Sequence, residues 1–414
     1  MHNNRKKVLI VGSSAKEYAF AKKVSEYGAD VFVAPGNKGI SEFANVVDIR
    51  EDNVSELLKF AFENNIDITI VLSEKAIKAD IATMFQSNNQ LIFSPSKKSA
   101  EITYSRAAAK KFLYKLRVDA PHFGVFDKVQ NAIDYLKKSP MPQVIHADNA
   151  FENGDRLVCS TFSVAKAFVE DLFARGEEKV ILEDFIYGHE FTFYVLTDGY
   201  HAIPLVSSAN YKFVENGDGG ILTCGVGSYV PDYKVSSEIE ENLMKDVITK
   251  TLNILQEKDS PYVGILGVDC VLSDDGKIYS LSFKSFLSDH DAQAILNIID
   301  ENLLNVFEAC SIGTFEDYKK IDVSDNSSVS CVVMSRTEGK KIEGLDKVDT
   351  IFTPFAINKN KYMEYETISG RNFVLTSTAK TLSRARKNLY DDLSQIKFCG
   401  IKYRSDICEM VENF

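Results

Sequence analysis

The sequence has little positive charge and no long apolar run. Its 48 lysine and arginine side chains are outnumbered by 59 aspartates and glutamates, which gives a formal net charge of -11. Because a nucleic-acid partner requires positive charge against its phosphates, this balance disfavours DNA and RNA. The apolar run at residues 8–11 ends at a glycine turn and is too short for a signal peptide or a membrane span. We therefore expect a cytoplasmic protein without a nucleic-acid or membrane partner.

Paired cysteines are also missing. The seven cysteines are scattered along the chain, and no two of them form a CxxC pair. This arrangement argues against a disulfide framework and against a zinc site. We expect the cysteines to be reduced and most of them to be buried. The sequence also contains no low-complexity segment and no internal repeat.

The patterns that are present indicate several α/β regions. With 414 residues the chain is too long for one ordinary core, so two to four domains are expected. In its first part, short apolar strands alternate with amphipathic helices, which is typical of a doubly wound parallel sheet. The expected strands lie at about 6–14, 29–37, 66–74 and 89–96, and the expected helices at 16–28 and 75–87. Later in the chain, continuous helices are predicted at 100–116 and 291–311.

Six phrases follow one another along nearly the whole chain. They are VFVAPGNKG at 31–39, IDITIVLSE at 66–74, FSPSKKSAEITYSRAAAKKFL at 93–113, VILEDFIYGHEFTFYVLTDG at 180–199, GVGSYVP at 225–231, and the terminal SGR and YRSDI around Arg371 and Arg404. In this order they resemble the glycinamide ribonucleotide synthetases, also called phosphoribosylamine–glycine ligases, of the ATP-grasp superfamily.

The resemblance implies an architecture and a reaction. The fold class is α/β, with an N-terminal doubly wound parallel-sheet domain at 1–102, a two-lobed ATP-grasp centre at 103–325, and a small C-terminal α+β domain at 326–414. A mobile lid module is expected at about 118–190. In the family's reaction, ATP phosphorylates the carboxylate of glycine, and the amine of 5-phosphoribosylamine displaces the phosphate. Two lysines and Mg²⁺, held by a glutamate and an asparagine, surround the transferred phosphate.

Several nucleotide-binding positions of the family hold suitable residues here. Arg106 stands at the place of the first ATP lysine and keeps its positive charge. Glu183, Asp184 and Phe185 match the hinge whose backbone binds adenine, and Glu190 matches the acid that follows. A strand with a capped end would explain the hinge residues equally well, so both interpretations stay open.

The second ATP lysine is absent. In VIHADNAFENGDRLV, residues 144–158, His146 stands at its place and no lysine occurs. On its ordinary pKa His146 is mostly neutral at pH 7, and carboxylates in the following loop would repel phosphates. We expect His146 to end a core strand, the loop to be a solvated turn, and ATP or ADP to bind weakly. The loop residues that replace small or basic ones are Asn149, Phe151, Glu152 and Asp155.

The metal-binding phrase departs most from the family. In LSFKSFLSDHDAQ, residues 281–293, Ser282 replaces the glutamate ligand, Lys284 the asparagine ligand, and Phe286 the substrate-binding arginine. Mg²⁺ prefers hard oxygen ligands and is repelled by a lysine, so Mg²⁺ binding is disfavoured. Asp269 on the preceding strand remains as a weak candidate ligand. An ion pair between Asp269 and Lys284 is the interpretation that we favour.

Some substrate-binding positions are retained. The turn GSSAKEYA keeps Gly12, followed by Ser13, where the family has a glycine-rich phosphate cradle, and an ordinary strand–helix turn is the alternative. The loop 210–231 keeps many residues of the family's substrate loop, although its glycines could fix only its path. The further substrate candidates are Lys212, Asp218, Gly225, Gly227 and Asp289.

Three functions are open on these observations. The favoured one is a degenerate family member, a pseudoenzyme that has lost ligation and binds a nucleotide or a sugar phosphate in a regulatory role. The second is an active ATP-dependent ligase of the purine biosynthesis type with a rewired site. The third is a purely structural assembly subunit with a protein partner. A monomer or a homodimer is compatible with all three.

Overall fold

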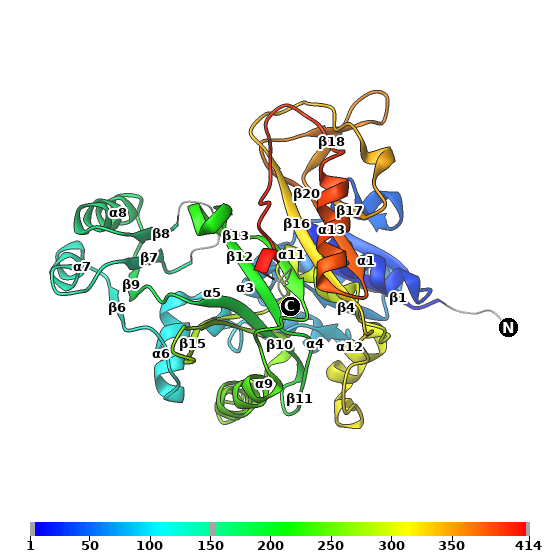
Figure 1. Ribbon diagram of the computed structural model, residues 1–414. Helices are drawn as coiled ribbons and strands as arrows, with labels where there is room; N and C mark the ends of the chain where they lie inside the picture. The colour runs from blue at the N-terminus through cyan, green and yellow to red at the C-terminus, as the bar shows by residue number, and fades with distance from the viewer. Residues whose placement is uncertain (1–4, 150–154, 411–414) are drawn as a thin grey trace.

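The N-terminal domain is a doubly wound parallel sheet, as predicted. The computed structural model describes residues 5–149 and 155–410. Five parallel strands follow the order β3-β2-β1-β4-β5 (Figure 1). The residues of β1 alternate between two apolar cores, one on each face of the sheet, which explains its continuous apolar run. The elements are β1 Lys7–Gly12, α1 Ala15–Glu26, β2 Asp30–Pro35, η1 Ile40–Glu42, β3 Asn45–Val46, α2 Val54–Asn64, β4 Ile68–Val71, α3 Glu74–Lys78, α4 Ile81–Ser87 and β5 Ile92–Phe93.

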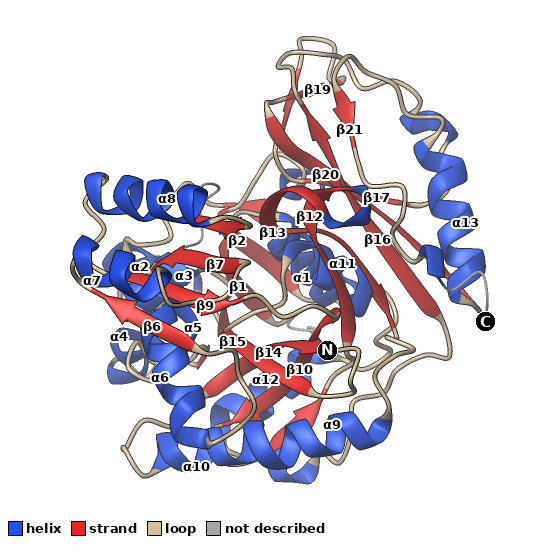
Figure 2. Cartoon of the chain, turned by 60° about the vertical axis from the view of Figure 1, so that its left-hand side comes forward, coloured by secondary structure: helices blue, strands red, loops and turns tan. Residues whose placement is uncertain are grey.

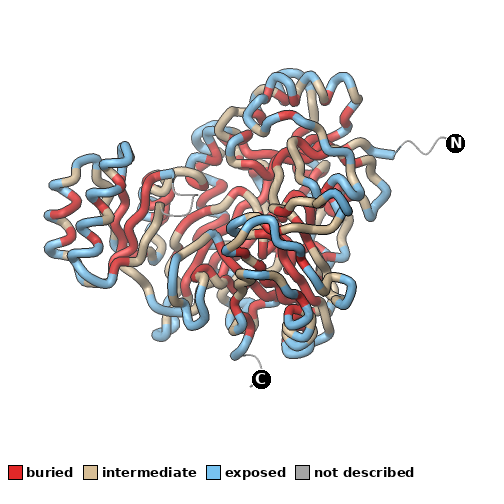
Figure 3. Tube along the Cα trace, turned by 90° about the horizontal axis from the view of Figure 1, so that it is seen from above, coloured by how far each residue is buried: buried red, intermediate tan, exposed pale blue. Residues whose placement is uncertain are grey.

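A four-stranded antiparallel sheet and two helices form the lid module. The strand order is β6-β9-β7-β8, and the sheet shares with the helices a core of its own that includes Ile145, Val169 and Leu182. The module projects from the side of the molecule in two views (Figures 1 and 3). Its elements are β6 Phe123–Phe126, α7 Val129–Leu136, β7 Gln143–Ala147, β8 Arg156–Cys159, α8 Phe162–Ala174 and β9 Val180–Asp184.

A ten-stranded antiparallel sheet joins the centre to the C-terminal region (Figure 2). Eight strands follow the order β15-β14-β10-β12-β13-β16-β20-β17, while β11 pairs with β10 and β21 with β16. Because Ser228 of β13 lies opposite Ser330 of β16, the two regions are hydrogen-bonded to each other. The domain bounds expected from the sequence stay a prediction. The strands are β10 His189–Asp198, β11 Ala202–Pro204, β12 Ser208–Glu215, β13 Gly219–Val230, β14 Val263–Leu272, β15 Ile278–Lys284, β16 Ser327–Ser335, β17 Ile351–Pro354, β20 Gly370–Ala379 and β21 Ile401–Lys402, with β18 Ile357–Lys359 and β19 Tyr365–Thr367 as a separate pair.

Three helices that were predicted as continuous are interrupted. Asp80 adopts a left-handed conformation between α3 and α4. Ser105 is extended and caps α6 by accepting a hydrogen bond from the amide of Ala108, and Asn302 caps α12 in the same way. The predictions of a continuous helix at 75–87, 100–116 and 291–311 are therefore wrong. The remaining helices and turns are α5 Glu101–Tyr104, α6 Arg106–Leu116, η2 Asn216–Asp218, α9 Ser237–Leu243, η3 Met244–Thr249, α10 Lys250–Gln256, α11 Asp289–Leu296, α12 Leu303–Ile312, η4 Phe315–Asp317, η5 Leu345–Lys347 and α13 Leu382–Leu393.

Most cysteines are buried, as expected. Five of the seven lie in the interior, and Cys224 and Cys399 are exposed. In the part of the chain that the structure describes, no helix has both the length and the apolar character needed to cross a bilayer.

Candidate functional site

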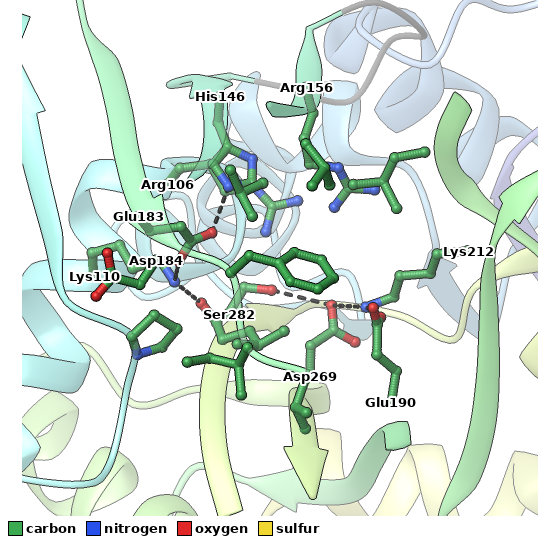
Figure 4. A pocket seen from close by; sticks show the side chains of 18 of the residues that line it. Arg106, Lys110, His146, Arg156, Glu183, Asp184, Glu190, Lys212, Asp269 and Ser282 are labelled. Atoms are coloured by element: carbon green, nitrogen blue, oxygen red, sulfur yellow. Dashed lines mark hydrogen bonds and ion pairs between the residues drawn. The ribbon is translucent and has the colours of Figure 1, made fainter. Parts of the chain in front are cut away.

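The cleft between the lid module and the central sheet contains an apolar slot (Figure 4). Val144 and Val158 line it from the lid strands β7 and β8. Val271 and Leu281 line it from the hairpin of β14 and β15. Apolar walls from two lobes suit a planar ring. Polar side chains line the same space, among them the buried Lys110, His146 and Glu183.

The predicted hinge residues lie beside this slot. The amide N–H groups of Asp184 and Phe185 donate to carbonyl oxygens of the lid at 3.0 and 3.3 Å. Asp184 also accepts a hydrogen bond from the side chain of Gln143 at 2.5 Å. Because these two N–H groups are already engaged, a backbone N–H donor to a base would have to come from a later residue, of which Ile186 lines the slot.

Glu183 is buried and is bound on two sides. Its carboxylate pairs with the ammonium of Lys110 and forms a hydrogen bond with Nε2 of His146 (Figure 4). Burial alone would raise the pKa of Glu183, but Lys110 and His146 hold that pKa well below its ordinary value. Burial lowers the pKa of His146 to about 4, against the opposing effect of Glu183. His146 therefore ends a buried strand and is neutral at pH 7, as predicted.

Asp269 on β14 is surrounded by donors from neighbouring strands. Its Oδ1 accepts a hydrogen bond from the hydroxyl of Thr192 at 2.6 Å and lies 2.9 Å from Nζ of Lys284. Its Oδ2 accepts from the hydroxyl of Ser282 at 3.1 Å and lies 3.5 Å from Nζ of Lys212. The predicted ion pair between Lys284 and Asp269 is thus confirmed.

The surroundings of Asp269 carry more positive than negative charge. Burial would raise the pKa of Asp269, but Lys212 and Lys284 hold it well below its ordinary value. Lys212 also pairs with Glu190 at 2.9 Å, so the two carboxylates share its ammonium. Within residues 5–149 and 155–410, no cluster of three or more His, Cys, Asp or Glu side chains could hold a metal ion.

A second cavity adjoins the slot, and six of its thirteen lining side chains are cationic. Arg106, Arg156 and Lys212 line both spaces. Such an excess of positive charge in a recess attracts anions, and we name this second space the cationic cavity. Its six cationic side chains are Lys16, Arg106, Arg156, Lys212, Lys284 and Arg371, and its two acidic ones are Asp269 and Asp289.

Asp289 links the N-terminal turn to the C-terminal region at the edge of the cationic cavity. It accepts hydrogen bonds from the hydroxyl of Ser14 at 2.7 Å and from the amide of Lys16 at 3.1 Å. Its carboxylate also lies 3.3 Å from Nη1 of Arg371 on β20. Burial would raise the pKa of Asp289, but Arg371 and Lys16 lower it to about 2.

The turn at Gly12 is filled by a carboxylate of the chain itself. A Cβ at Gly12 would lie 2.1 Å from Oε1 of Glu17, and the φ of Gly12 is +142°. The amide of Ser14 donates to Oε2 of Glu17 at 2.8 Å. The carbonyl of Ser13 accepts from Asn37 at 2.9 Å. These contacts favour the strand–helix turn over a phosphate cradle.

The predicted residues of the loop 210–231 have different environments. Lys212 lines both cavities. Asp218 lies 2.7 Å from the guanidinium of Arg404, and its side chain is 65% exposed. A Cβ at Gly225 or Gly227 would lie 1.9 or 2.2 Å from a packed side chain. Close packing therefore explains these two glycines.

Arg156 is the cation that the sequence analysis missed. The stretch 144–158 has no lysine, yet Arg156 at the start of β8 lines both cavities and donates to the carbonyl of Thr223 at 2.7 Å. Its place at the end of the loop that follows His146 could have indicated a cation at this cleft. Asp155 lies 3.1 Å from Arg175 on the lid. Phe151 and Glu152 lie outside the described residues.

Stability is expected to fall in acid because of Asp289. Its folded pKa of about 2 lies below the ordinary value of 3.8, so its contribution is present above about pH 4 and is lost as the pH falls toward 2. In urea unfolding, Asp289→Asn is expected to cost about 2 kcal/mol at pH 7 and much less at pH 2.5. An equal loss at both pH values would contradict this assignment.

The two lobes, the slot between them and the parallel-sheet domain define the class of ATP-grasp proteins. Comparison with known families then identifies the group within this class. The phosphoribosylglycinamide synthetase family matches with its N domain at residues 6–103 and with its ATP-grasp (A) domain at residues 104–292. The chain belongs to this family.

Individual relatives agree with this assignment. The phosphoribosylamine–glycine ligase of Caldanaerobacter subterraneus subsp. tengcongensis is 31% identical, over 97% of this chain and 99% of its own. That of Clostridium acetobutylicum is 29% identical, over 97% and 99%. Two crystal structures share the fold. The Thermotoga maritima phosphoribosylamine–glycine ligase has a TM-score of 0.80 at 21% identity, covering 97% of this chain and 100% of that chain. The biotin carboxylase domain of the Hydrogenobacter thermophilus 2-oxoglutarate carboxylase has a TM-score of 0.73 at 15% identity, covering 97% and 92%.

Proposed function

We propose that this protein binds an adenine nucleotide between its lid module and its central sheet. We further propose that it has lost the metal-assisted ligation of its family and uses nucleotide binding in a regulatory role. One observation carries the proposal: an apolar slot directly adjoins a cavity with six cationic and two acidic side chains. A ligand with a flat ring and an anionic tail fits this pair of spaces.

His146, which lines the slot, carries a candidate acceptor for the base. His146 is neutral at pH 7, and its Nε2 is engaged with the ionised Glu183, so we assign the proton to Nε2. Nδ1 of His146 is then an acceptor, and it is buried without a hydrogen-bond partner among the described residues. A buried acceptor without a partner is costly unless a ligand provides a donor. The exocyclic amino group of adenine is such a donor.

Three substitutions support the loss of ligation. Ser282 and Lys284 occupy the places of the family's two metal ligands, and both bind Asp269. Phe286 occupies the place of the family's substrate arginine, and the ammonium of Lys16 lies 4.8 Å from its ring centre. On this assignment the ligands that would hold Mg²⁺ against the transferred phosphate are missing, and the charge that the metal supplies is missing with them.

A second candidate function is ATP-dependent ligation of glycine to 5-phosphoribosylamine. It is favoured by the full-length similarity to proteins named phosphoribosylamine–glycine ligase. In this function the cationic cavity, with Arg371 and Lys16, would hold the sugar phosphate. Release of ADP that depends on both co-substrates distinguishes this function from binding alone.

Isothermal titration with ADP tests the proposal. The protein is expected to bind ADP, and Val158→Trp, which fills the slot, is expected to weaken binding at least tenfold, or about 1.4 kcal/mol. Arg156→Gln is expected to lower the affinity for ADP but not for adenosine, because only ADP has phosphates.

The matched control is Val164→Trp on α8, because Val164 is 47% exposed and lies outside the slot. This variant should bind ADP like the parent protein. If millimolar ADP produces no heat of binding with the parent protein, nucleotide binding is not its function.

A further inference from the structure

The residues around Asp269 do not fit a Mg²⁺ ion. Mg²⁺ requires a near-ideal octahedron of oxygen ligands, usually including one or two carboxylates. Here the four lone-pair positions of the Asp269 carboxylate are matched by four protein donors, at 2.6 to 3.5 Å. A metal ion at Asp269 would have to displace some of these donors, and it would be repelled by the ammonium groups of Lys212 and Lys284.

Lys284 is held in this place by the fold. Its Nζ lies 3.0 Å from the hydroxyl of Ser288 and 2.9 Å from Asp269, and its side chain is only 18% exposed. The register of β14 and β15 sets Ser282 opposite Asp269, two residues before Lys284, so all three residues meet at one end of the hairpin. The ammonium is therefore a fixed charge at the wall of the cationic cavity.

The cavity can also neutralise an anion without a metal. Its cationic lining side chains exceed its acidic ones by four. Asp269 pairs with Lys212 and Lys284, and Asp289 pairs with Arg371. Two further carboxylates engage cations of the wall, because Glu17 pairs with Lys16 and Glu190 with Lys212. The guanidinium of Arg371 has two buried nitrogens, Nε and Nη2, without a hydrogen-bond partner among the described residues. Such donors suit the oxygens of a phosphate.

We propose that the protein binds the phosphates of a nucleoside di- or triphosphate in metal-free form, with Lys284 as a tethered cation where its relatives are expected to place Mg²⁺. The ligand is then the free nucleotide and not its Mg²⁺ complex. This inference rests on the proposed nucleotide site, but it makes a separate demand. A site that takes the Mg²⁺ complex of a nucleotide has a higher affinity for the nucleotide when Mg²⁺ is added. The site proposed here must show no such increase.

The test is titration of the full-length protein with ATP, ADP and AMP, in EDTA and in millimolar Mg²⁺. We expect ATP and ADP to bind in EDTA, and to bind equally well or up to about tenfold more weakly in Mg²⁺, because the metal sequesters the free nucleotide. The affinity for AMP should change by less than about twofold when Mg²⁺ is added. Binding of ATP that is tenfold or more tighter in Mg²⁺ would overturn the inference and leave the proposed function intact. No binding of any nucleotide in either buffer would remove both.

Variants of the hairpin identify the residue responsible. Lys284→Gln is expected to lower the affinity for ATP about tenfold in EDTA and to change the affinity for AMP by less than about twofold. The matched control is Lys277→Gln on the same hairpin, where Lys277 is 54% exposed and outside both cavities. In the double variant Ser282→Glu/Lys284→Asn the effect of Mg²⁺ should be reversed, so that adding Mg²⁺ raises the affinity for ATP at least tenfold.

Two results would remove the role of Lys284. One is equal loss of ATP affinity in Lys284→Gln and Lys277→Gln. The other is a folded double variant that binds ATP without any response to Mg²⁺, which would mean that other residues exclude the metal. If the double variant does not fold, the titrations of the parent protein and of Lys284→Gln decide the question.

Discussion

With phosphoribosylamine, glycine, ATP and Mg²⁺ present together, the protein is expected to release ADP at least about 10³-fold more slowly than the Caldanaerobacter subterraneus relative. Removing one preorganised charge from a transition state typically costs about 10²- to 10³-fold in rate. From the sequence resemblance we expect Ser282, Lys284 and Phe286 to stand in place of three polar or charged groups of the family's site, and the structure places Lys284 against Asp269. A coupled assay of ADP release, with each substrate omitted in turn, measures the rate.

A turnover on the order of 1 per second that required both phosphoribosylamine and glycine would establish the ligase function instead. The control is the same assay with the relative, which shows that the unstable amine was present. The variant Ser282→Glu/Lys284→Asn/Phe286→Arg is a gain-of-function test. An increase in ADP release of at least tenfold would attribute a low rate of the parent protein to these positions.

Lys110→Met is expected to lower the free energy of unfolding by about 3–5 kcal/mol. Lys110 and Glu183 form an ion pair in which both side chains are less than one tenth exposed. Removing the ammonium leaves a buried carboxylate whose other partner, His146, is neutral at pH 7. An unpaired buried charge is far more costly than the loss of one hydrogen bond. Urea unfolding at pH 7 measures the loss.

The neighbouring Lys111→Met is the matched control, because Lys111 is exposed on the same helix and should change stability by less than about 0.5 kcal/mol. The double variant Lys110→Met/Glu183→Gln removes both charges, and it should regain at least about half of the loss. If Lys110→Met is no more destabilising than Lys111→Met, Glu183 is not held by this pair.

Four of the five strands of the N-terminal sheet were predicted, because they carry apolar runs, whereas β3 has only two residues, both exposed, and was missed. The four apolar residues of β1 are each 0% exposed, and their sequence shows this directly. The helix interruptions were not predictable from periodicity. Ser105 leaves the apolar pattern at 100–116 intact, and the break depends on its hydroxyl and on Asp148, 43 residues away, to which that hydroxyl donates at 2.9 Å.

Within the site, the sequence predicted contacts that follow from strand register. The pair of Lys284 and Asp269 could be inferred because the two strands of one hairpin place their side chains together. The neutral state of His146 followed from its residue type and from its place at the end of an apolar strand.

The sequence by itself therefore determined the family and the parallel sheet, because these depend on local pattern and on the order of the matching phrases, and the replacement of the metal ligands stays a prediction from that resemblance. The tertiary structure alone decided which charges share a cavity. Lys16, Arg156 and Arg371 are separated by more than a hundred residues, yet they line one recess because three regions of the fold meet there. It also decided that Glu17 fills the turn at Gly12, because a side-chain rotamer and its burial are properties of packing.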